Sequence, residues 1–277
     1  MSIISSIRNI ISRYVMPRVF LNWSDQDIVL KKRKEKEEIR KKEGRPHEVF
    51  YFHELLDPYS HITAQLINKF KAEYSVDLIP LLVNEPPNKT VHEPSMYRKY
   101  CLTDAIRISP FYGVEFQNDK LPNEKVISLA KRVLCSLERE EFISKIAEIS
   151  TLVWSDNEMA LKALINEGTL SEETILSTIS NNELKRDEVE AYMGSTFSYE
   201  GELYWGVDRL DHLEHRLKDL GLKRNVDANY ISERKKTNTS DIPKHSNIEL
   251  EFYPSLNSPY TSISLERIKL LQSNYPV

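Results

Sequence analysis

The sequence predicts an α/β protein in which a long helical insertion interrupts a sheet, and three observations lead to this prediction. Two strand-like runs flank a helix start between residues 47 and 83. Helical patterns without strand alternation fill residues 94–192. Two short strand-like runs then surround a two-residue turn at residues 200 and 201. A chain of 277 residues, of which 40% are hydrophobic and 29% charged, is long enough to bury one full core around such a sheet.

The charge and the cysteine content argue against two classes of function. The 38 basic residues face 42 acidic ones, and a net charge of -4 gives no general attraction to the phosphates of nucleic acids. The two cysteines, Cys101 and Cys135, form no CxxC motif, so redox chemistry by the protein's own dithiol is not expected. Free thiols suit a reducing compartment. We therefore expect a cytoplasmic protein, with a mitochondrial or membrane-peripheral location as the alternative.

Residues 1–46 are predicted to form an amphipathic helix followed by a charged helical arm. The apolar residues of the first helix recur with the helical period and are Ile3, Ile4, Ile7, Ile10, Ile11, Tyr14 and Val15. Two interpretations of residues 3–15 stay open, packing against the rest of the protein or a membrane-surface or targeting helix. Residues 31–45 carry nine basic and four acidic residues, which predicts a solvated helix with short-range ion pairs. A basic arm for anionic lipid is the alternative.

A βαβ unit is predicted between residues 47 and 83. Residues 49–52 are an aromatic and β-branched run typical of a buried strand, and residues 76–83 are a second apolar run. Between them Asp57-Pro58 starts a helix, because the aspartate accepts hydrogen bonds from first-turn amides and proline has no amide to leave unpaired. A right-handed crossover makes the two strands parallel. The N-terminus of the helix then lies at one edge of the sheet, where an anion or a thiolate is stabilised.

The rest of the domain is predicted to be a helical block, a hairpin and a final helix. The strand-like residues 196–199 and 202–205 flank Glu200-Gly201, which is typical of a two-residue hairpin loop. Leucines at helical spacing follow, and the domain is expected to end near residue 222. The order β, α, β, helical insertion at about residues 90–192, β-hairpin and α-helix predicts a thioredoxin-like sheet.

Four local motifs resemble those of one protein family and occur in the same order. They are FYFHELLDPYS at residues 50–60, NEPP at residues 84–87, VWSDNE at residues 153–158 and ELYWGVDRLDHL at residues 202–213. With these motifs, residues 47–222 resemble the 2-hydroxychromene-2-carboxylate isomerases and the kappa-class glutathione transferases, a branch of the DsbA-like thioredoxin superfamily. The resemblance implies a glutathione-dependent isomerase or transferase that acts on a small hydrophobic substrate, and it implies a homodimer.

The resemblance also implies where glutathione would bind. The thiol would lie at the N-terminus of the first helix, and the backbone of Gly194 and Ser195 would pair with the glutathione cysteine. Asn84 would contact the peptide, while Asp208 and Arg209 would hold the γ-glutamyl group. A thiolate at the helix N-terminus is stabilised by unpaired amides, and a neutral hydroxyl donor adds a hydrogen bond to the sulfur.

Two positions of this sequence depart from the family pattern. Asp57 stands where the family has the serine that holds the thiol, and a carboxylate beside the sulfur raises the pKa of the bound thiol. We therefore expect a degenerate first active site, in which Asp57 acts as a helix N-cap rather than as a catalytic residue. Ser195 stands where the family has a cis-proline, and a cis bond before a non-proline residue costs about 2.5 to 4 kcal/mol.

Residues 248–277 resemble the start of a second copy of the fold. Residue 248 aligns with residue 47 and residue 277 with residue 76, and eight aligned positions are identical. Ser258 restores the family's serine before a proline, so the second copy would be the catalytic one. Residues 223–247 are polar and predict a linker. We expect a truncated second repeat, and the alternative is an extra strand and helix packed onto the first domain.

Other candidate chemistry has simpler structural explanations. His212 and His215 are three residues apart without a third ligand at metal-site spacing, so we expect a surface pair and no metal. His53 and His61 flank the helix start and are either bases near a ligand or, as we favour, covers of the strand end. The sequence contains no glycine-rich phosphate loop, which argues against nucleotide binding.

Two functions from different classes remain. The first is a glutathione-dependent isomerase or transferase relative, whose catalysis would use Ser258. The second is a non-catalytic DsbA-like scaffold or pairing module, and we favour it for this chain because both hallmark positions of the first copy are altered. Thiol–disulfide exchange is a third and weaker hypothesis, since no CxxC stands at the helix start.

Overall fold

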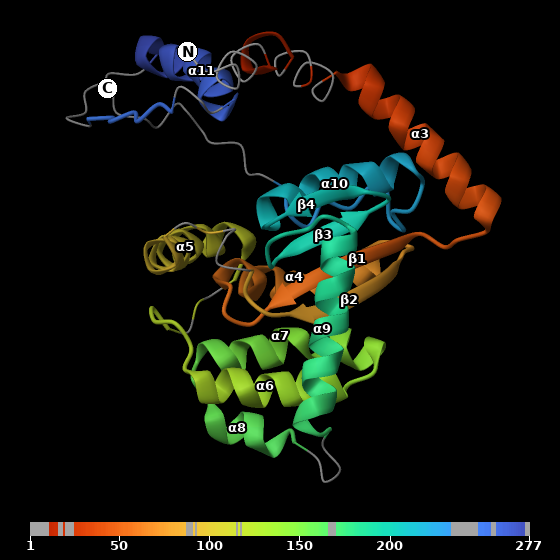
Figure 1. Ribbon diagram of the computed structural model, residues 1–277, viewed down its shortest axis with the longest axis vertical. Coiled ribbons are helices and arrows are strands. Elements are labelled where there is room, and N and C mark those ends of the chain that lie inside the picture. The colour runs from red at the N-terminus through yellow and green to blue at the C-terminus, as the bar shows by residue number, and fades with distance from the viewer. Residues whose placement is uncertain are drawn as a thin grey trace. The chain divides into compact units, whose positions relative to one another are not determined.

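The computed structural model describes residues 11–15, 19, 25–86, 91, 93–114, 116, 118–165, 170–233, 249–255 and 259–274 (Figure 1). The chain divides into two compact units, residues 1–234 and residues 235–277. The first unit contains the sheet and the helices packed on it, and the second contains the helix α11 (Pro259–Asn274). No helix in the described ranges is long and apolar enough to cross a lipid bilayer.

A mixed sheet with the strand order β2-β1-β3-β4 forms the centre of the first unit. Its strands are β1 (Glu48–Glu54), β2 (Asp77–Val83), β3 (Thr196–Tyr199) and β4 (Glu202–Trp205). β1 and β2 are parallel, whereas the pairs β1–β3 and β3–β4 are antiparallel. This order and its connections are consistent with a DsbA-like thioredoxin fold, so the predicted α/β fold with a helical insertion is confirmed at that level.

Helix α4 (Pro58–Glu73) connects the two parallel strands and begins where the sequence predicts. Asp57 caps its N-terminus, and Pro58 occupies the first turn, where no intrahelical amide bond is lost. The buried aliphatic and aromatic residues of its inward face are Ile62, Ala64, Leu66, Ile67 and Phe70. Burial of one such large side chain contributes about 1.5–3 kcal/mol, so packing, more than helix propensity, holds α4 on the sheet.

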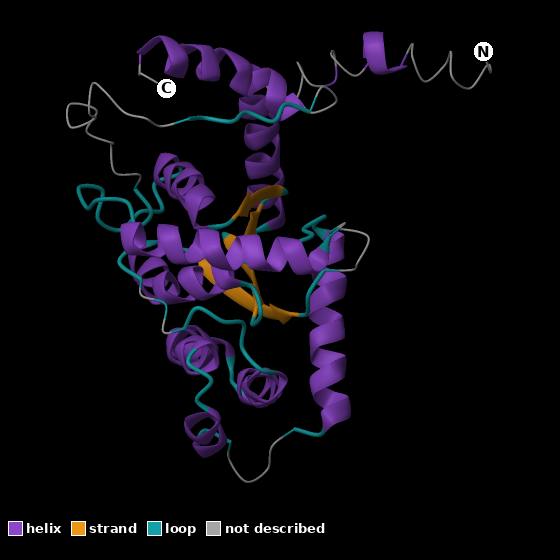
Figure 2. Cartoon of the chain, turned by 90° about the vertical axis from the view of Figure 1, so that its left-hand side faces the viewer, coloured by secondary structure: helices purple, strands orange, loops and turns teal. Residues whose placement is uncertain are grey.

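The predicted helical block lies between β2 and β3. It consists of α5 (Pro94–Ile108), η2 (Ser109–Tyr112), α6 (Glu124–Ser136), α7 (Arg139–Trp154), α8 (Glu158–Ala163) and α9 (Glu172–Glu188). α7 packs along α4, where Gln65 donates to the Ala147 carbonyl oxygen at 3.2 Å. α9 packs on β2, where Asn182 donates to the Leu82 carbonyl oxygen at 2.9 Å. Figure 2 shows the strands in the middle of this unit, with helices on several sides.

Helix α3 (Gln26–Glu43) is the predicted charged helix, and we refer to it as the charged arm. Gly44 ends it in the left-handed conformation, with a φ of 67°, which glycine adopts without a steric penalty. Glu37 and Arg40 form an ion pair at 2.7 Å within the helix. The expected short-range ion pairs are therefore present.

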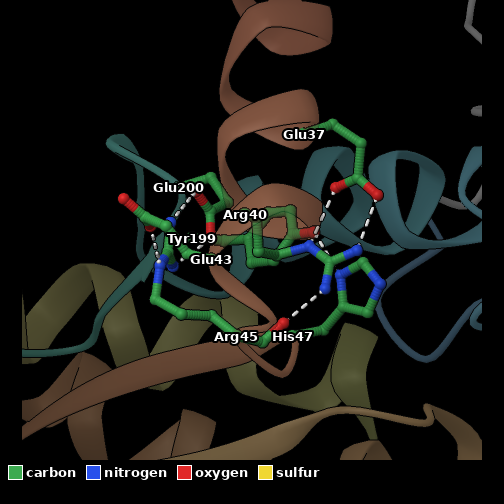
Figure 3. A network of polar contacts seen from close by, with 7 residues as sticks. All are labelled: Glu37, Arg40, Glu43, Arg45, His47, Tyr199 and Glu200. Atoms are coloured by element: carbon green, nitrogen blue, oxygen red, sulfur yellow. Dashed lines mark hydrogen bonds and ion pairs between the residues drawn. The ribbon is translucent and has the colours of Figure 1, made fainter.

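The charged arm is also bound to the β3–β4 hairpin, which the sequence pattern does not reveal. Arg45 pairs with Glu200 at 2.9 Å, and the buried Arg40 donates to the Arg45 carbonyl oxygen at 2.6 Å (Figure 3). Nearer the N-terminus of the arm, the Arg33 Nε donates to the Glu202 Oε1 at 2.8 Å, and the Arg33 Nη2 donates to the Glu202 Oε2 at 2.5 Å. Arg33 within the helix and Arg45 just after it thus hold the arm to the hairpin, while the lysines of the helix stay exposed.

The predicted amphipathic helix at residues 3–15 lies mostly outside the described residues. Residues 11–15 form a short π-helical segment, in which Ile11, Tyr14 and Val15 are exposed. Both interpretations of this helix, and any peripheral membrane contact through it, stay predictions.

The first unit extends to residue 234, beyond the predicted domain end near residue 222. The amides of Ile231 and Ser232 donate to the buried Glu214 carboxylate at 2.8 and 3.0 Å. The polar composition of this segment predicts a linker, and most of its residues are exposed, although Ser232 is buried. The predicted linker at residues 223–247 stays a prediction.

The second copy of the fold is not visible as a strand followed by a helix. Residues 249–255 form no strand, because a single strand without a neighbour leaves its backbone groups unpaired. The helix α11 begins at Pro259, as the aligned position predicts. Ser258 lies outside the described residues, so its proposed catalytic role and the truncated repeat stay predictions.

Candidate functional site

A narrow cavity of about 50 Å³ lies at the N-terminus of α4, beside the carboxyl ends of β1 and β2. Three acidic residues line it, Glu54, Asp57 and Glu85, and we call it the carboxyl cavity. A wider hollow of about 580 Å³, the aromatic groove, shares part of this lining. The residues that line the aromatic groove are Val91, Glu93, Met96, Tyr97, Tyr100, Tyr192, Met193 and Trp205. The two hollows together present an apolar surface that leads to carboxyl groups.

Asp57 occupies the N-cap of α4 with both carboxylate oxygens engaged. Oδ1 accepts from the Tyr59 amide at 3.2 Å, and Oδ2 accepts from the Ser60 amide at 2.9 Å and the Ser60 hydroxyl at 2.8 Å. Burial raises the pKa of Asp57 to about 6, although these hydrogen bonds act in the opposite direction. The predicted N-cap role is confirmed, and the free amides of the helix N-terminus are already used by the protein.

Glu54 ends β1 and lines the same cavity, a position that the sequence pattern does not reveal. It is 7% exposed, and its carboxyl group makes no hydrogen bond to the part of the chain that the structure describes. Burial raises its pKa well above the ordinary value, and the charges of Asp57 and Glu85 raise it further. The Glu54 amide donates to the Ser60 hydroxyl oxygen at 3.2 Å, so Ser60 joins the two carboxyl-bearing residues. Glu54 and Asp57 together retain a proton close to neutral pH.

The stability of Asp57→Asn relative to wild type is expected to be higher at pH 8 than at pH 4. The folded-state pKa of Asp57 lies near 6, above the ordinary value of 3.8, so the folded state binds this proton more tightly than the unfolded state does. The stabilisation that comes from binding this proton is fully present below pH 3.8, and it is lost as the pH rises through 6. Asparagine removes the charge and keeps one of the two capping oxygens, and the loss of the other oxygen does not depend on pH. Urea unfolding at both pH values measures the difference.

The matched control is Asp25→Asn, because Asp25 caps α3 in the same way but is exposed. The stability of this variant relative to wild type should change much less between pH 4 and pH 8. If Asp57→Asn and Asp25→Asn respond equally to pH, burial of Asp57 does not raise its pKa.

Gly194 and Ser195 precede β3, and the structure brings Gly194 to the carboxyl cavity. A Cβ on Gly194 would lie 2.6 Å from the Glu54 Cβ and 3.1 Å from the Ser60 Oγ. Ser195 is buried with a φ of 51°, and no cis peptide bond occurs in the described ranges. Its carbonyl oxygen accepts from the Gly206 amide at 2.8 Å. The pairing of the Gly194 and Ser195 backbone with the glutathione cysteine stays a prediction.

Asn84 follows β2 and lines a third hollow of about 560 Å³ next to Glu54. Its side-chain oxygen accepts from the Lys131 Nζ at 2.6 Å. Its amide donates to the Glu183 Oε1 at 3.2 Å, and its carbonyl oxygen accepts from the buried Arg186 at 2.9 Å. Three of its polar groups are therefore engaged by α6 and α9, and its contact with a bound peptide stays a prediction.

Asp208 and Arg209 lie in the first turn of α10 (Val207–Asp219), and both side chains are about half exposed. They form an ion pair with each other at 3.6 Å. Arg209 lines a different cavity, among side chains of α3, β4 and α10, and neither residue lines the carboxyl cavity or the aromatic groove. The structure does not place these two residues with Asp57, and their role toward a γ-glutamyl group stays a prediction.

Cys101 and Tyr97 on α5 also line the carboxyl cavity, although the sequence analysis assigned them no role there. Burial raises the pKa of the Cys101 thiol to about 11, so this thiol is neutral at physiological pH. Their spacing of four residues on one helix face is the signal that could have placed them together. The cavity thus contains a thiol of the protein that is not activated as a nucleophile.

The histidines near the site have structural partners. His53 is buried beside the Tyr51 hydroxyl, with 3.1 Å between its Nδ1 and the oxygen, and burial lowers its pKa to about 3. His61 is buried with its Nδ1 2.8 Å from the Ser150 hydroxyl and stacks on Trp154. These contacts support the interpretation of both histidines as parts of the core. No group of three or more potential ligands is placed to hold a metal ion in the described ranges.

No protein-family model matches the chain, and no curated protein matches it. A solved structure does. The chain is similar to 2-hydroxychromene-2-carboxylate isomerase, in a structure of its selenomethionine form, with 16% sequence identity and a TM-score of 0.45. The match covers 63% of this chain and 96% of that chain. The fold assignment itself rests on the strand order and connections of this chain.

Proposed function

We propose that the first unit is a thioredoxin-fold module that binds a small hydrophobic molecule in the aromatic groove and does not activate a thiol. The observation that carries this proposal is the position of Asp57, whose carboxylate accepts from the amides of Tyr59 and Ser60. These amides are the donors that a thiolate at the helix N-terminus would need. A thiolate would also meet the negative charge of Asp57, which raises the pKa of a neighbouring acid.

The residues present do not fit glutathione. The α4 amides are taken by Asp57, the Ser195 carbonyl oxygen accepts from the Gly206 amide, and the Asn84 side chain accepts from Lys131. The α4 amides would have to exchange Asp57 for the tripeptide, whereas the Ser195 carbonyl oxygen and the Asn84 side chain are each already engaged by one partner in the protein. Accordingly, we assign no step of chemistry to a glutathione thiol in this unit.

The aromatic groove favours a small apolar ligand with a hydrogen-bond donor at one end. Several of its apolar side chains are exposed, among them Met96, Tyr100 and Tyr192, and a contiguous exposed apolar surface is typical of a binding site. In the adjoining carboxyl cavity, Glu54 offers a nearly buried carboxyl group without a hydrogen-bond partner from the described residues. An amine or hydroxyl group of the ligand would supply that partner.

Binding of the uncharged dye Nile red, followed by its fluorescence, tests the aromatic groove. Truncation of Met96 to alanine should weaken binding about fivefold, because it removes part of the apolar surface that the ligand covers. Met159→Ala is the matched control, since Met159 is an 82% exposed methionine on α8 that does not line the groove. Equal affinities of the two variants, or no saturable binding by the wild type, would refute the proposal.

A glutathione-dependent isomerase or transferase is the second candidate function. The observation that favours it is the start of α4, where Pro58 follows the N-cap and α4 joins two parallel strands. On this hypothesis glutathione and a small hydrophobic substrate are the partners, and the protein works as a homodimer. A second copy with Ser258 would supply the intact site.

A glutathione titration separates the two candidates. Calorimetry and the ultraviolet absorbance of the bound thiolate should show no thiolate for the wild type, because Asp57 holds the helix amides. Asp57→Ser restores a neutral donor and should lower the pKa of any bound thiol. A thiolate band in the wild type would favour the glutathione-dependent enzyme over the binding module.

A further inference from the structure

A separate cavity of about 390 Å³ lies among side chains of α3, β4 and α10. We call it the arginine cavity, and it shares no lining residue with the carboxyl cavity or the aromatic groove. The charged and imidazole side chains that line it are those of Arg33, Arg209, His212, His215, Arg216 and Asp219. Three arginines thus face one carboxylate.

Arg216 is the residue of this cavity that lacks hydrogen-bond partners. It is 9% exposed, and its Nε–H is buried without an acceptor. The Glu202 Oε1 lies 3.9 Å from this nitrogen, too far for a hydrogen bond. A guanidinium group has five N–H donors, and of those of Arg216 the Nε–H is buried without an acceptor in the described residues. Burying a charged donor in this way costs free energy unless an acceptor forms a hydrogen bond with it.

Glu202 is an ion-pair neighbour of Arg216 rather than its hydrogen-bond partner, and other donors bind the Glu202 carboxylate. Its carboxylate accepts from the Arg33 Nε at 2.8 and 3.1 Å, from the Arg33 Nη2 at 2.5 Å and from the Tyr204 hydroxyl at 2.9 Å. Arg209 likewise has Asp208 beside it at 3.6 Å. Arg216 is therefore the lining arginine whose donor is both buried and without an acceptor in the described residues.

The spacing of the donors suits a group with several acceptor oxygens. Arg209, His212 and Arg216 are three and seven residues apart on α10, so they project from one face of the helix. A phosphate group offers three terminal oxygens, and arginine binds two of them in a planar, two-pronged arrangement. A cavity of this volume has room for a phosphate group together with the molecule that carries it.

We propose that the arginine cavity binds a phosphate group, with Arg216 as its principal donor and Arg209 as a second one. The phosphate supplies the acceptor that the buried Nε–H of Arg216 lacks beside its long ion pair with Glu202. Free phosphate compounds and phospholipid headgroups share this chemistry, and exposed lysines on the neighbouring charged arm are compatible with either source.

Calorimetric titration of the full chain with inorganic phosphate, and sedimentation with vesicles that contain phosphatidic acid, tests the proposal. Pure phosphatidylcholine vesicles are the blank. Arg216→Gln should weaken phosphate binding about tenfold, since it removes a charge-assisted hydrogen bond. Arg209→Gln should weaken it less, because that side chain is half exposed. Arg107→Gln, which changes an exposed arginine of α5 outside the cavity, should leave binding unchanged.

A thermal unfolding series gives a readout that does not depend on the heat of binding. Phosphate should raise the unfolding temperature of the wild type and of Arg107→Gln, and at the same concentration it should raise that of Arg216→Gln less. Binding of the vesicles without binding of inorganic phosphate would identify a lipid headgroup, and the reverse a free compound. If neither ligand binds saturably, or if all variants bind equally, the proposal is wrong.

Discussion

Gly194→Ala is expected to destabilise the first unit by about 1–3 kcal/mol and to weaken binding in the aromatic groove, which adjoins the carboxyl cavity through Tyr97 and Met193. The added Cβ would lie 2.6 Å from the Glu54 Cβ and 2.9 Å from its Oε2, closer than such atoms approach. Glu54 cannot retreat easily, because it ends the central strand β1. Displacement of the Glu54 carboxyl group would change the carboxyl cavity, where the polar end of the proposed ligand would bind.

Urea unfolding and the Nile red titration measure both effects of the Gly194 substitution. Gly221→Ala is the control, because no atom lies within 4 Å of its added Cβ and its cost comes from a φ of 74° alone. That cost is about 1 kcal/mol, and dye binding should persist. A Gly194→Ala protein that is as stable as wild type and binds the dye equally well would show that the cavity wall is not rigid.

Glu214→Ala should cost at least about 3 kcal/mol of unfolding free energy and should release the segment that follows α10. Glu214 is fully buried and accepts four hydrogen bonds through its two oxygens. The donors are the Tyr74 hydroxyl at 2.9 Å, the Ile231 amide at 2.8 Å, and the Ser232 amide and hydroxyl at 3.0 and 2.8 Å. Alanine leaves all four donors without this acceptor.

Amide hydrogen exchange reports this effect at the residues concerned. The Ile231 and Ser232 amides should exchange much faster in Glu214→Ala. The exchange rates of amides in the central strands should change only as far as the global stability of the protein changes. Glu233→Ala is the matched control, since Glu233 is exposed at the end of the same segment. Unchanged protection of Ile231 and Ser232 in Glu214→Ala would contradict the anchoring role of the carboxylate.

Features set by neighbouring residues could be predicted from the sequence. Asp57-Pro58 starts α4 as expected, because the cap and the proline act within one turn. Glu200-Gly201 forms the tight hairpin loop, and both residues have positive φ, 48° and 83°. Such local rules also gave the order of strands and helices, since each element carries its own apolar period.

Features that depend on distant residues could not be predicted in this way. The raised pKa of Glu54 comes from burial and from charges on Asp57 and Glu85, which only the folded chain brings together. Arg209 was grouped with Asp208 because both stand in one motif, yet Arg209 lines the same cavity as Arg216. Motif matching follows the order of residues along the chain, whereas a helix places residues seven apart on the same side.

The ion pairs between the charged arm and the hairpin imply two levels of resistance to salt. Salt screens ion pairs at the protein surface. The Arg33–Glu202 and Arg45–Glu200 pairs are only partly shielded from water, so salt weakens them. The sheet, in contrast, is held by apolar packing that salt does not weaken. Concentrated sodium chloride should therefore detach the arm first, and trypsin should then cut at its many lysines while the remaining domain resists digestion. Because Arg33 on the arm forms one wall of the arginine cavity, ionic strength would also regulate how far that cavity is open.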